Sequence, residues 1–395
     1  MSVFVVFLFV LAVFDLMVGV SNDAVNFLNS AIGAKVAKFR TIIIVATVGV
    51  FMGATMSNGM MEVARNGVFH PAMFSLKELM FIFLAVIISD VILLDIFNNL
   101  GLPTSTTVSL VFELLGGTTA FVLLKLANDT TGLTVGDLMN TEKALGMIMA
   151  IFVSVAIAFF FGIVLQYISR LVFTFTYKKN LKWKIGIFGG VATTAIFYFM
   201  LFKGIKSMSF VTPEIYEYIQ NHTLAILGIC FLASTAIMQF LYFLKVNVFK
   251  ILVLMGTFAL AMAFAGNDLV NFIGVPLAGY SAYTDFAASG ASDPSTFMMS
   301  SLEGPAKSPM IFLVAAGAVM VFSLATSKKA HNVIKTSVDL SRQSEGDEMF
   351  GSSKIARVLV RFSNNTANFF QDVVPDNVKA WCEKRFNTDE ARLPE

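Results

Sequence analysis

The sequence is poor in charge. Only 14% of its 395 residues are Asp, Glu, Lys or Arg, whereas a soluble domain carries about 25%. Apolar residues make up 56% of the chain, and its mean hydropathy is +0.76. This composition excludes an ordinary soluble domain and predicts a chain that folds in a bilayer, with membrane lipid around it. The net charge of +2 gives no reason to expect a nucleic-acid partner.

Cysteine and histidine are also scarce. Cys230 lies in an apolar run and Cys382 in a polar segment, so we expect neither a metal pair nor a disulfide between them. The three histidines, His70, His222 and His331, lie in loops or helix flanks. A membrane-embedded enzyme acting on lipid phosphates would need a histidine or a metal-ligand cluster inside the membrane. We therefore expect no enzyme and no cofactor, and keep such an enzyme as the weaker alternative.

Basic residues are missing from the first 20 positions. A cleaved signal peptide has Lys or Arg before its apolar core, so Met1–Val20 is expected to stay as the first membrane helix. Eight more apolar stretches could cross the bilayer, some of them as half-helices that meet inside it. The predicted spans are Val3–Val20, Thr41–Met56, Leu79–Phe97, Thr106–Leu126, Ala144–Phe173, Ile185–Phe202, Thr223–Leu244, Ile251–Ala265 and Met310–Thr326. They predict an all-α polytopic membrane protein.

The basic loops agree on one orientation. Lysines are concentrated in Tyr177–Lys184, and basic residues also occur in residues 35–40, in residues 245–250 and from Lys328 onward. Because basic loops stay in the cytoplasm, these four clusters are expected inside and the N-terminus outside. We expect a multi-pass protein of the cell (inner) membrane, with a cytoplasmic tail after Lys328.

The chain is expected to divide into three parts. Residues 1–176 form a first membrane repeat, and residues 177–327 hold linking helices and the start of a second repeat. Residues 328–395 form a polar cytoplasmic tail or an inter-repeat linker, in which Ile355–Phe370 has the pattern of an amphipathic helix on the membrane surface.

One short pattern occurs twice, each time after an apolar helix. The letters N-D-x-V-N-F cover residues 22–27 and return at residues 267–272. By the loop order the first copy ends a helix that runs inward and the second ends a helix that runs outward, as in inverted-repeat transporters, whose site lies where the repeats meet. Carboxylate, carboxamide and freed carbonyl oxygens suit a small hard cation such as Na⁺. The alternative is a helix end that only caps the next helix.

A run of hydroxyl residues follows Pro103. In Gly-Leu-Pro-Thr-Ser-Thr-Thr, residues 101–107, proline and four hydroxyl residues precede an apolar run. The free N–H groups of a helix N-terminus attract anions, and hydroxyls add donors without adding charge. The pattern predicts a cradle for phosphate or sulfate. The alternative is a helix start that satisfies only its own backbone.

The two patterns complement each other chemically. Bare carboxylates repel a divalent oxyanion at low dielectric, and Na⁺ bound between Asp23, Asp268 and the anion removes that repulsion. Anion affinity then depends on the bound cation, which is the thermodynamic basis of symport. Hydroxyl and N–H donors barely distinguish phosphate from sulfate. A permease for sulfate or another tetrahedral oxyanion on the same scaffold is therefore the alternative.

These segments resemble the inorganic phosphate transporter (PiT) family of sodium- or proton-coupled phosphate permeases. The likeness rests on residues 19–26, 101–107 and 265–271 and covers about residues 1–326. It implies an all-helical inverted-repeat fold with broken or re-entrant helices, and cation-coupled phosphate uptake by alternating access. It also implies that Asp23, Asn26, Asp268 and Asn271 are cation ligands, and that the phosphate is bound by Asn22, Ser105, Thr106, Thr107 and Asn267.

The sequence departs from the family pattern in three places. Val108 stands where the family usually has histidine, and Thr41–Met56 lacks the acidic residue that is common in the second helix. No second Pro-x-Ser-Thr-Thr segment follows Asn271, and the nearest pattern is Asp293–Thr296. We therefore expect that the chain is a fragment with an incomplete second repeat. The coupling ion, Na⁺ or H⁺, and the assembly state, with a homodimer as one alternative, stay open.

Four more acidic residues lie in the predicted spans: Asp15, Asp90, Asp95 and Glu113. Acids inside a membrane often mark ion pathways or proton relays. Asp90 is expected either to relay protons and tune the site or to have a hydrogen-bonded structural role. Asp15 is expected to face a polar neighbour. Glu113 lies two turns after the hydroxyl run, where it either contacts the transport pathway or lies away from it.

Overall fold

The computed structural model describes residues 1–56, 64–65, 67–128, 132–200, 212–304, 308–340, 351 and 353–387. Within these ranges the chain is helical and forms no strand, only two isolated β-bridges, between Phe69 and Met139 and between Ser75 and Met298. Both bridges join loops that flank the helices. The prediction of an all-α fold is confirmed.

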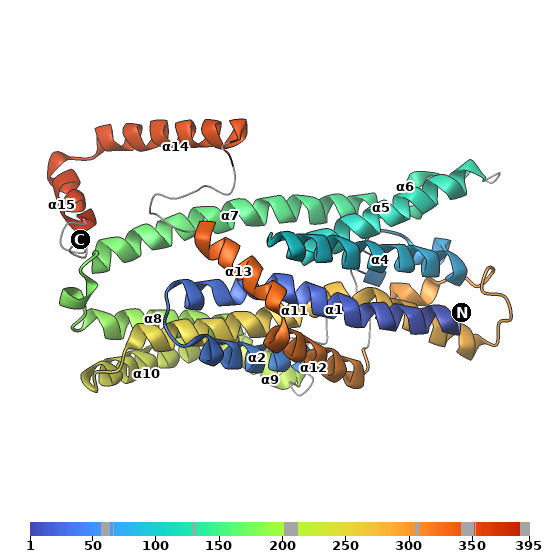
Figure 1. The fold of residues 1–395 in the computed structure, drawn as a ribbon, viewed down its shortest axis with the longest axis horizontal. Coiled ribbons are helices and arrows are strands. Elements are labelled where there is room, and N and C mark those ends of the chain that lie inside the picture. Colours follow the sequence, from blue (N-terminus) through green and yellow to red (C-terminus); the bar gives the residue numbers. More distant parts are fainter. Residues whose placement is uncertain are drawn as a thin grey trace.

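Fourteen α-helices lie in the part of the chain that the structure describes, and most of them run along one common axis (Figure 1). The first seven are α1 (Ser2–Gly33), α2 (Phe39–Met56), α4 (Leu76–Leu100), α5 (Thr106–Ala127), α6 (Val135–Leu138), α7 (Thr141–Phe173) and α8 (Lys184–Phe199). The others are α9 (Pro213–Asn221), α10 (Thr223–Phe243), α11 (Val248–Ser289), α12 (Met310–Thr326), α13 (Lys328–Leu340), α14 (Lys354–Val373) and α15 (Asp376–Phe386). Short 3-10 helices occur at Pro71–Met73, Tyr177–Asn180 and Ser300–Glu303.

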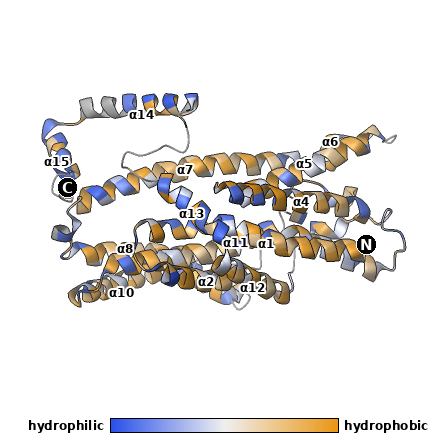
Figure 2. Cartoon of the chain, viewed as in Figure 1, coloured by the Kyte–Doolittle hydropathy of each residue, from blue (hydrophilic) through white to orange (hydrophobic). Residues whose placement is uncertain are grey.

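Seven of these helices are long and apolar enough to cross a membrane: α1, α2, α4, α5, α7, α10 and α11. The pair α12 and α13, bent by 67° at its break, makes an eighth, and α8 is a shorter apolar helix. Figure 2 shows the apolar residues spread along these parallel helices. The regions agree with the nine predicted spans, although residues 201 and 202 of the span Ile185–Phe202 lie outside the described ranges.

Both copies of the repeated pattern lie inside long helices. We expected Val3–Val20 and Ile251–Ala265 to end just before them, and this was wrong, because α1 and α11 continue through the pattern without a break. At 1.5 Å per residue the two helices are about 48 and 63 Å long, longer than the ~30 Å core of a bilayer. Polar side chains that find partners on other helices do not force a helix to end.

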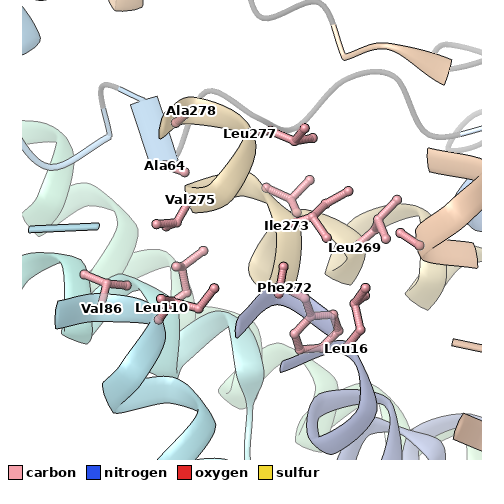
Figure 3. Packing of buried hydrophobic residues seen from close by; sticks show 14 of the residues in the cluster. Leu16, Ala64, Val86, Leu110, Leu269, Phe272, Ile273, Val275, Leu277 and Ala278 are labelled. Carbon is pink, nitrogen blue, oxygen red and sulfur yellow. The ribbon is translucent and has the colours of Figure 1, made fainter. Parts of the chain in front are cut away.

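The two pattern-bearing helices cross in opposite directions. As residue numbers rise along α1, the numbers of the contacting residues fall along α11. The contacting pairs are Leu8 with Gly279, Phe9 with Tyr280, Gly19 with Phe272 and Phe27 with Phe264. Figure 3 shows Phe272 beside Leu16 in the apolar packing at this crossing. The predicted opposite orientation of the two copies is confirmed.

Helix α2 lies very close to α11 because glycine removes the side chains between them. A Cβ atom added at Gly53 would overlap the backbone carbonyl of Met262, and one added at Gly49 would lie 2.6 Å from the carbonyl oxygen of Phe258. Small residues permit this kind of close backbone approach between membrane helices. The contact holds α11, and with it the second copy of the pattern, in place.

The segment after Lys328 begins as part of the bundle. Helix α13 buries Ala330, Val333 and Ile334 and packs mainly against α1, while Lys329 forms an ion pair with Asp95 of α4. The polar composition of α13 did not indicate this packing, because most of its residues are polar and only one face is apolar. That residues 328–395 form a cytoplasmic tail or an inter-repeat linker stays a prediction. The predicted amphipathic segment falls within α14, while residues 341–350 and 388–395 of the predicted tail lie outside the described ranges.

Gly53→Ala is expected to destabilise the protein by about 1–3 kcal/mol, because the new methyl group collides with the carbonyl of Met262. Gly116→Ala in α5 is the matched control, since a Cβ there meets nothing within 4 Å. The higher helix propensity of alanine should leave that variant unchanged or stabilised by up to about 1 kcal/mol. Thermal unfolding in detergent micelles measures both. Equal melting temperatures for the two variants would contradict the close packing of α2 and α11.

Candidate functional site

Five of the predicted site residues, from three helices, form one hydrogen-bonded cluster. Thr106 Oγ1 donates to Asp23 Oδ2 at 3.1 Å and so joins α5 to α1. Asn271 Nδ2 lies 3.1 Å from Thr106 Oγ1, 3.0 Å from Thr107 Oγ1 and 3.2 Å from Asp268 Oδ1. Thr107 Oγ1 is 3.5 Å from Asp268 Oδ1. The hydroxyl run and both copies of the acidic pattern therefore meet at one place, which we call the Asp23–Asp268 cluster.

The cluster is buried and rich in negative charge. Asp23 is 5% exposed and Asp268 8%, whereas Thr107 is exposed. The two carboxyl groups act on each other electrostatically, and across the described ranges no Lys, Arg or His side chain faces either of them. Two like charges in a low-dielectric interior are unfavourable unless a positive charge joins them.

The donor set suits a monovalent hard cation more than a transition metal. No group of three or more His, Cys, Asp or Glu side chains in the described ranges is placed to hold a metal ion. The oxygen atoms that gather in the cluster come from two carboxyl groups and two hydroxyl groups, and the carboxamide of Asn271 donates to them through Nδ2. Hydroxyl groups can also donate to an oxyanion, so the same residues offer contacts to both kinds of ion.

Asn22, which we expected to bind phosphate, lies outside the Asp23–Asp268 cluster. Its side chain is fully buried, and Nδ2 donates to Asn98 Oδ1 at 2.8 Å and to the carbonyl of Leu102 at 3.0 Å. Its Oδ1 accepts a hydrogen bond of 2.8 Å from the backbone N–H of Thr104. Asn98 in turn donates to the carbonyl of Val18 at 2.7 Å. Asn22 thus fixes the loop before α5 against α1, and its contact with phosphate stays a prediction.

The other three predicted residues lie outside the cluster. Ser105 is exposed, and its hydroxyl accepts from the backbone N–H of Val108 at 3.3 Å, so it caps α5. Asn26 is exposed on α1, and Asn267 is half-buried on α11. In the ranges that the structure describes, the side chains of these three residues make no hydrogen bond to the five cluster residues. Only part of the hydroxyl run, Thr106 and Thr107, faces the acids.

A serine network beside Asp23 was not predicted. Ser21 Oγ lies 2.7 Å from both the carbonyl oxygen of Met17 and Ser327 Oγ. Ser323 also donates to Met17 O, at 2.9 Å, and Ser327 caps α13 through the N–H of Ala330. The bend between α12 and α13 is therefore attached to α1 next to the first pattern. The sequence indicates this network only through Ser327, which lies between the apolar segment that ends at Thr326 and the polar segment that follows.

Comparisons with known proteins agree with this geometry. The sequence matches the phosphate transporter family (PHO4) over residues 19–337, a range that contains all five cluster residues. The fold is similar to a solved structure described as the sodium-dependent phosphate transporter, with a TM-score of 0.58 and 17% identity over 87% of this chain and 79% of that chain. Among curated proteins, no sequence matches significantly. With well over half of its length matched, this protein belongs to the phosphate transporter family, a class of membrane transporters and not of enzymes.

Proposed function

We propose that the chain carries inorganic phosphate together with Na⁺ across the membrane, and that both bind at the Asp23–Asp268 cluster. One observation carries this proposal: Thr106 and Thr107 share hydrogen bonds with Asn271 and with the two carboxyl groups. Hydroxyl and carboxamide N–H donors, which an oxyanion needs, therefore lie directly beside the carboxylate oxygens that a hard cation needs.

The charge of the cluster makes phosphate binding depend on the cation. Asp23 and Asp268 face no basic side chain in the described ranges, so a phosphate anion entering alone would meet only like charge. Na⁺ ions held by the carboxyl groups change that repulsion into attraction. Because each ion raises the affinity for the other, the two are carried together.

Alternating access requires that helices around the cluster bend, and two features of the structure mark places where they can. Pro276 lies inside α11, five residues after Asn271, where it removes a backbone hydrogen bond of the helix. On the other side, Ser21 attaches the bend between α12 and α13 to α1. We expect bending at these two points to move the helices that surround the cluster.

Removing the charge of either acid is expected to abolish coupled transport. Asp23→Asn and Asp268→Asn keep the side-chain shape but lose the charge that holds Na⁺. Each should lower sodium-driven uptake of radiolabelled phosphate into proteoliposomes by at least about tenfold. Asp293→Asn is the control, because Asp293 is exposed and, in the described ranges, its hydrogen bonds go to Ser295 and Thr296 of its own loop. If wild-type uptake does not depend on the sodium gradient, the proposed coupling to Na⁺ is wrong. If excess sulfate blocks the uptake, the site does not select phosphate and sulfate becomes the better candidate for the substrate.

Asn22→Ala tests whether Asn22 positions the loop or touches phosphate. The variant leaves the N–H of Thr104 and the carboxamide of Asn98 without their partner, which costs roughly 1–3 kcal/mol of stability. We expect a lower melting temperature together with weaker uptake, whereas Asn99→Ala, at an exposed neighbouring position, should change neither. A variant that melts like the wild type and yet shows a raised KM for phosphate would instead assign Asn22 to the substrate.

We also propose that the N-terminus lies outside the cell membrane and the segment after Lys328 inside, as the basic loops indicate. In a Cys230→Ser background, Cys382 is the remaining thiol and should react with a membrane-impermeant maleimide only after the cells are permeabilised. A Ser2→Cys variant that also carries Cys230→Ser and Cys382→Ser should react in intact cells. Labelling of Cys382 in intact cells would place the segment after Lys328 outside, opposite to the proposed orientation.

A further inference from the structure

A second group of acidic side chains lies farther along α1 and α5, where these helices meet α4. It consists of Asp15 on α1, Asp90 on α4 and Glu113 on α5, with Ser109 of α5 between the last two. Asp15 and Asp23 are eight residues apart on α1, which is about 12 Å along the helix axis. We call the group the Asp15–Asp90 cluster. Neither the family match nor the fold similarity assigns it a role.

The contacts in this cluster require more protons than the serine can supply. Ser109 Oγ lies 2.7 Å from Asp90 Oδ1 and 2.8 Å from Glu113 Oε1. A serine hydroxyl has a single proton to donate, so one of these two contacts needs a protonated carboxyl group as its donor. The carboxyl groups of Asp15 and Asp90 also act on each other, and two neighbouring carboxyl groups in an apolar site are stabilised by a shared proton.

Burial leads to the same requirement. Asp15 and Asp90 are each 1% exposed, and Asp15 Oδ1, Asp90 Oδ2 and Glu113 Oε2 are buried without a hydrogen-bond partner in the described ranges. Leu16, Val86 and Leu110, their close sequence neighbours, belong to the apolar packing in Figure 3. Three ionised carboxyl groups in such surroundings would be strongly unfavourable.

The charged groups around the cluster do not relieve this. Asp15 faces Asp90, Glu113 and, farther away, Asp23, which is itself opposed by Asp268 of α11. From α1, α4, α5 and α11, as far as the structure describes them, no basic side chain acts on the cluster. Nor are these three acids placed as a metal site in those ranges. Protons are the positive charge that fits the contacts.

We propose that Asp15, Asp90 and Glu113 form a proton-binding site inside the membrane bundle that controls the position of α5. With the proton bound, Ser109 links Asp90 and Glu113, and α5 is held against α4. When the proton leaves to water, like charges face each other and α5 is pushed away. Thr106 and Thr107 lie on the same helix, so proton loss disturbs the Asp23–Asp268 cluster. This second step rests on the proposed transport function, whereas the proton site itself does not.

Infrared spectroscopy of the protein in proteoliposomes tests the proton site without any transport. The wild type should show a protonated-carboxyl band at neutral pH that disappears as the pH is raised. Asp15→Asn and Asp90→Asn should weaken it, and Asp293→Asn, which changes an exposed acid, should leave it unchanged. Because these amides have the shape of a protonated acid, we expect the variants to fold. An unchanged band in both Asp15→Asn and Asp90→Asn would overturn the proposal.

The pH dependence of sodium-driven phosphate uptake tests the control of α5. The ratio of Asp90→Asn uptake to wild-type uptake at each pH removes the effect of phosphate's own ionisation. This ratio should rise by about threefold or more toward alkaline pH, because the amide cannot lose a proton. A ratio that stays flat would overturn the control of α5. If the wild type shows no sodium-driven uptake, the proposed function fails, while the infrared band still decides the proton site.

Discussion

A carboxyl group inside a membrane must find a partner, and this constraint organises the centre of the molecule. Asp23 and Asp268 each lie within a helix that is otherwise apolar, where an isolated charge would be costly. The structure meets this cost by crossing α1 and α11 at their polar segments and by directing Thr106 and Asn271 at the acids. The close contact of Gly19 with Phe272 allows α1 and α11 to approach this far, and that of Gly53 with Met262 brings α2 equally close to α11.

The sequence was informative where length and charge decide the structure. Apolar runs of bilayer length predicted the spans, and the repeated pattern together with the basic loops predicted that α1 and α11 run in opposite directions. The helix ends were not predictable, because hydrogen bonds from other helices satisfy Asn22 and Asp23 and let α1 continue to Gly33. Helix α13 was misread for a similar reason, since its composition is polar although one face packs on α1.

The hydroxyl run shows why residue types alone could not assign the site. Three adjacent residues have the same chemistry, but each step along a helix rotates the side chain by about 100°. Ser105 points back to cap its own helix, Thr106 reaches Asp23, and Thr107 reaches Asn271. Similarly, Asn26 and Asn271 occupy the same position in the two copies of the pattern, but Asn26 is exposed whereas Asn271 binds Asp268. These roles follow from how the helices meet, which the local sequence does not contain.

The two acidic clusters share helices, and this links their chemistry. Helix α1 carries Asp15 and Asp23, and α5 carries Glu113 as well as Thr106. Any displacement of α5 that favours one cluster therefore changes the geometry of the other. Thermodynamic linkage makes such an effect mutual: if a proton at Asp90 alters the affinity for phosphate and Na⁺, their binding alters the proton affinity by the same factor. A transporter built in this way would respond to pH through a site that touches neither of its transported ions.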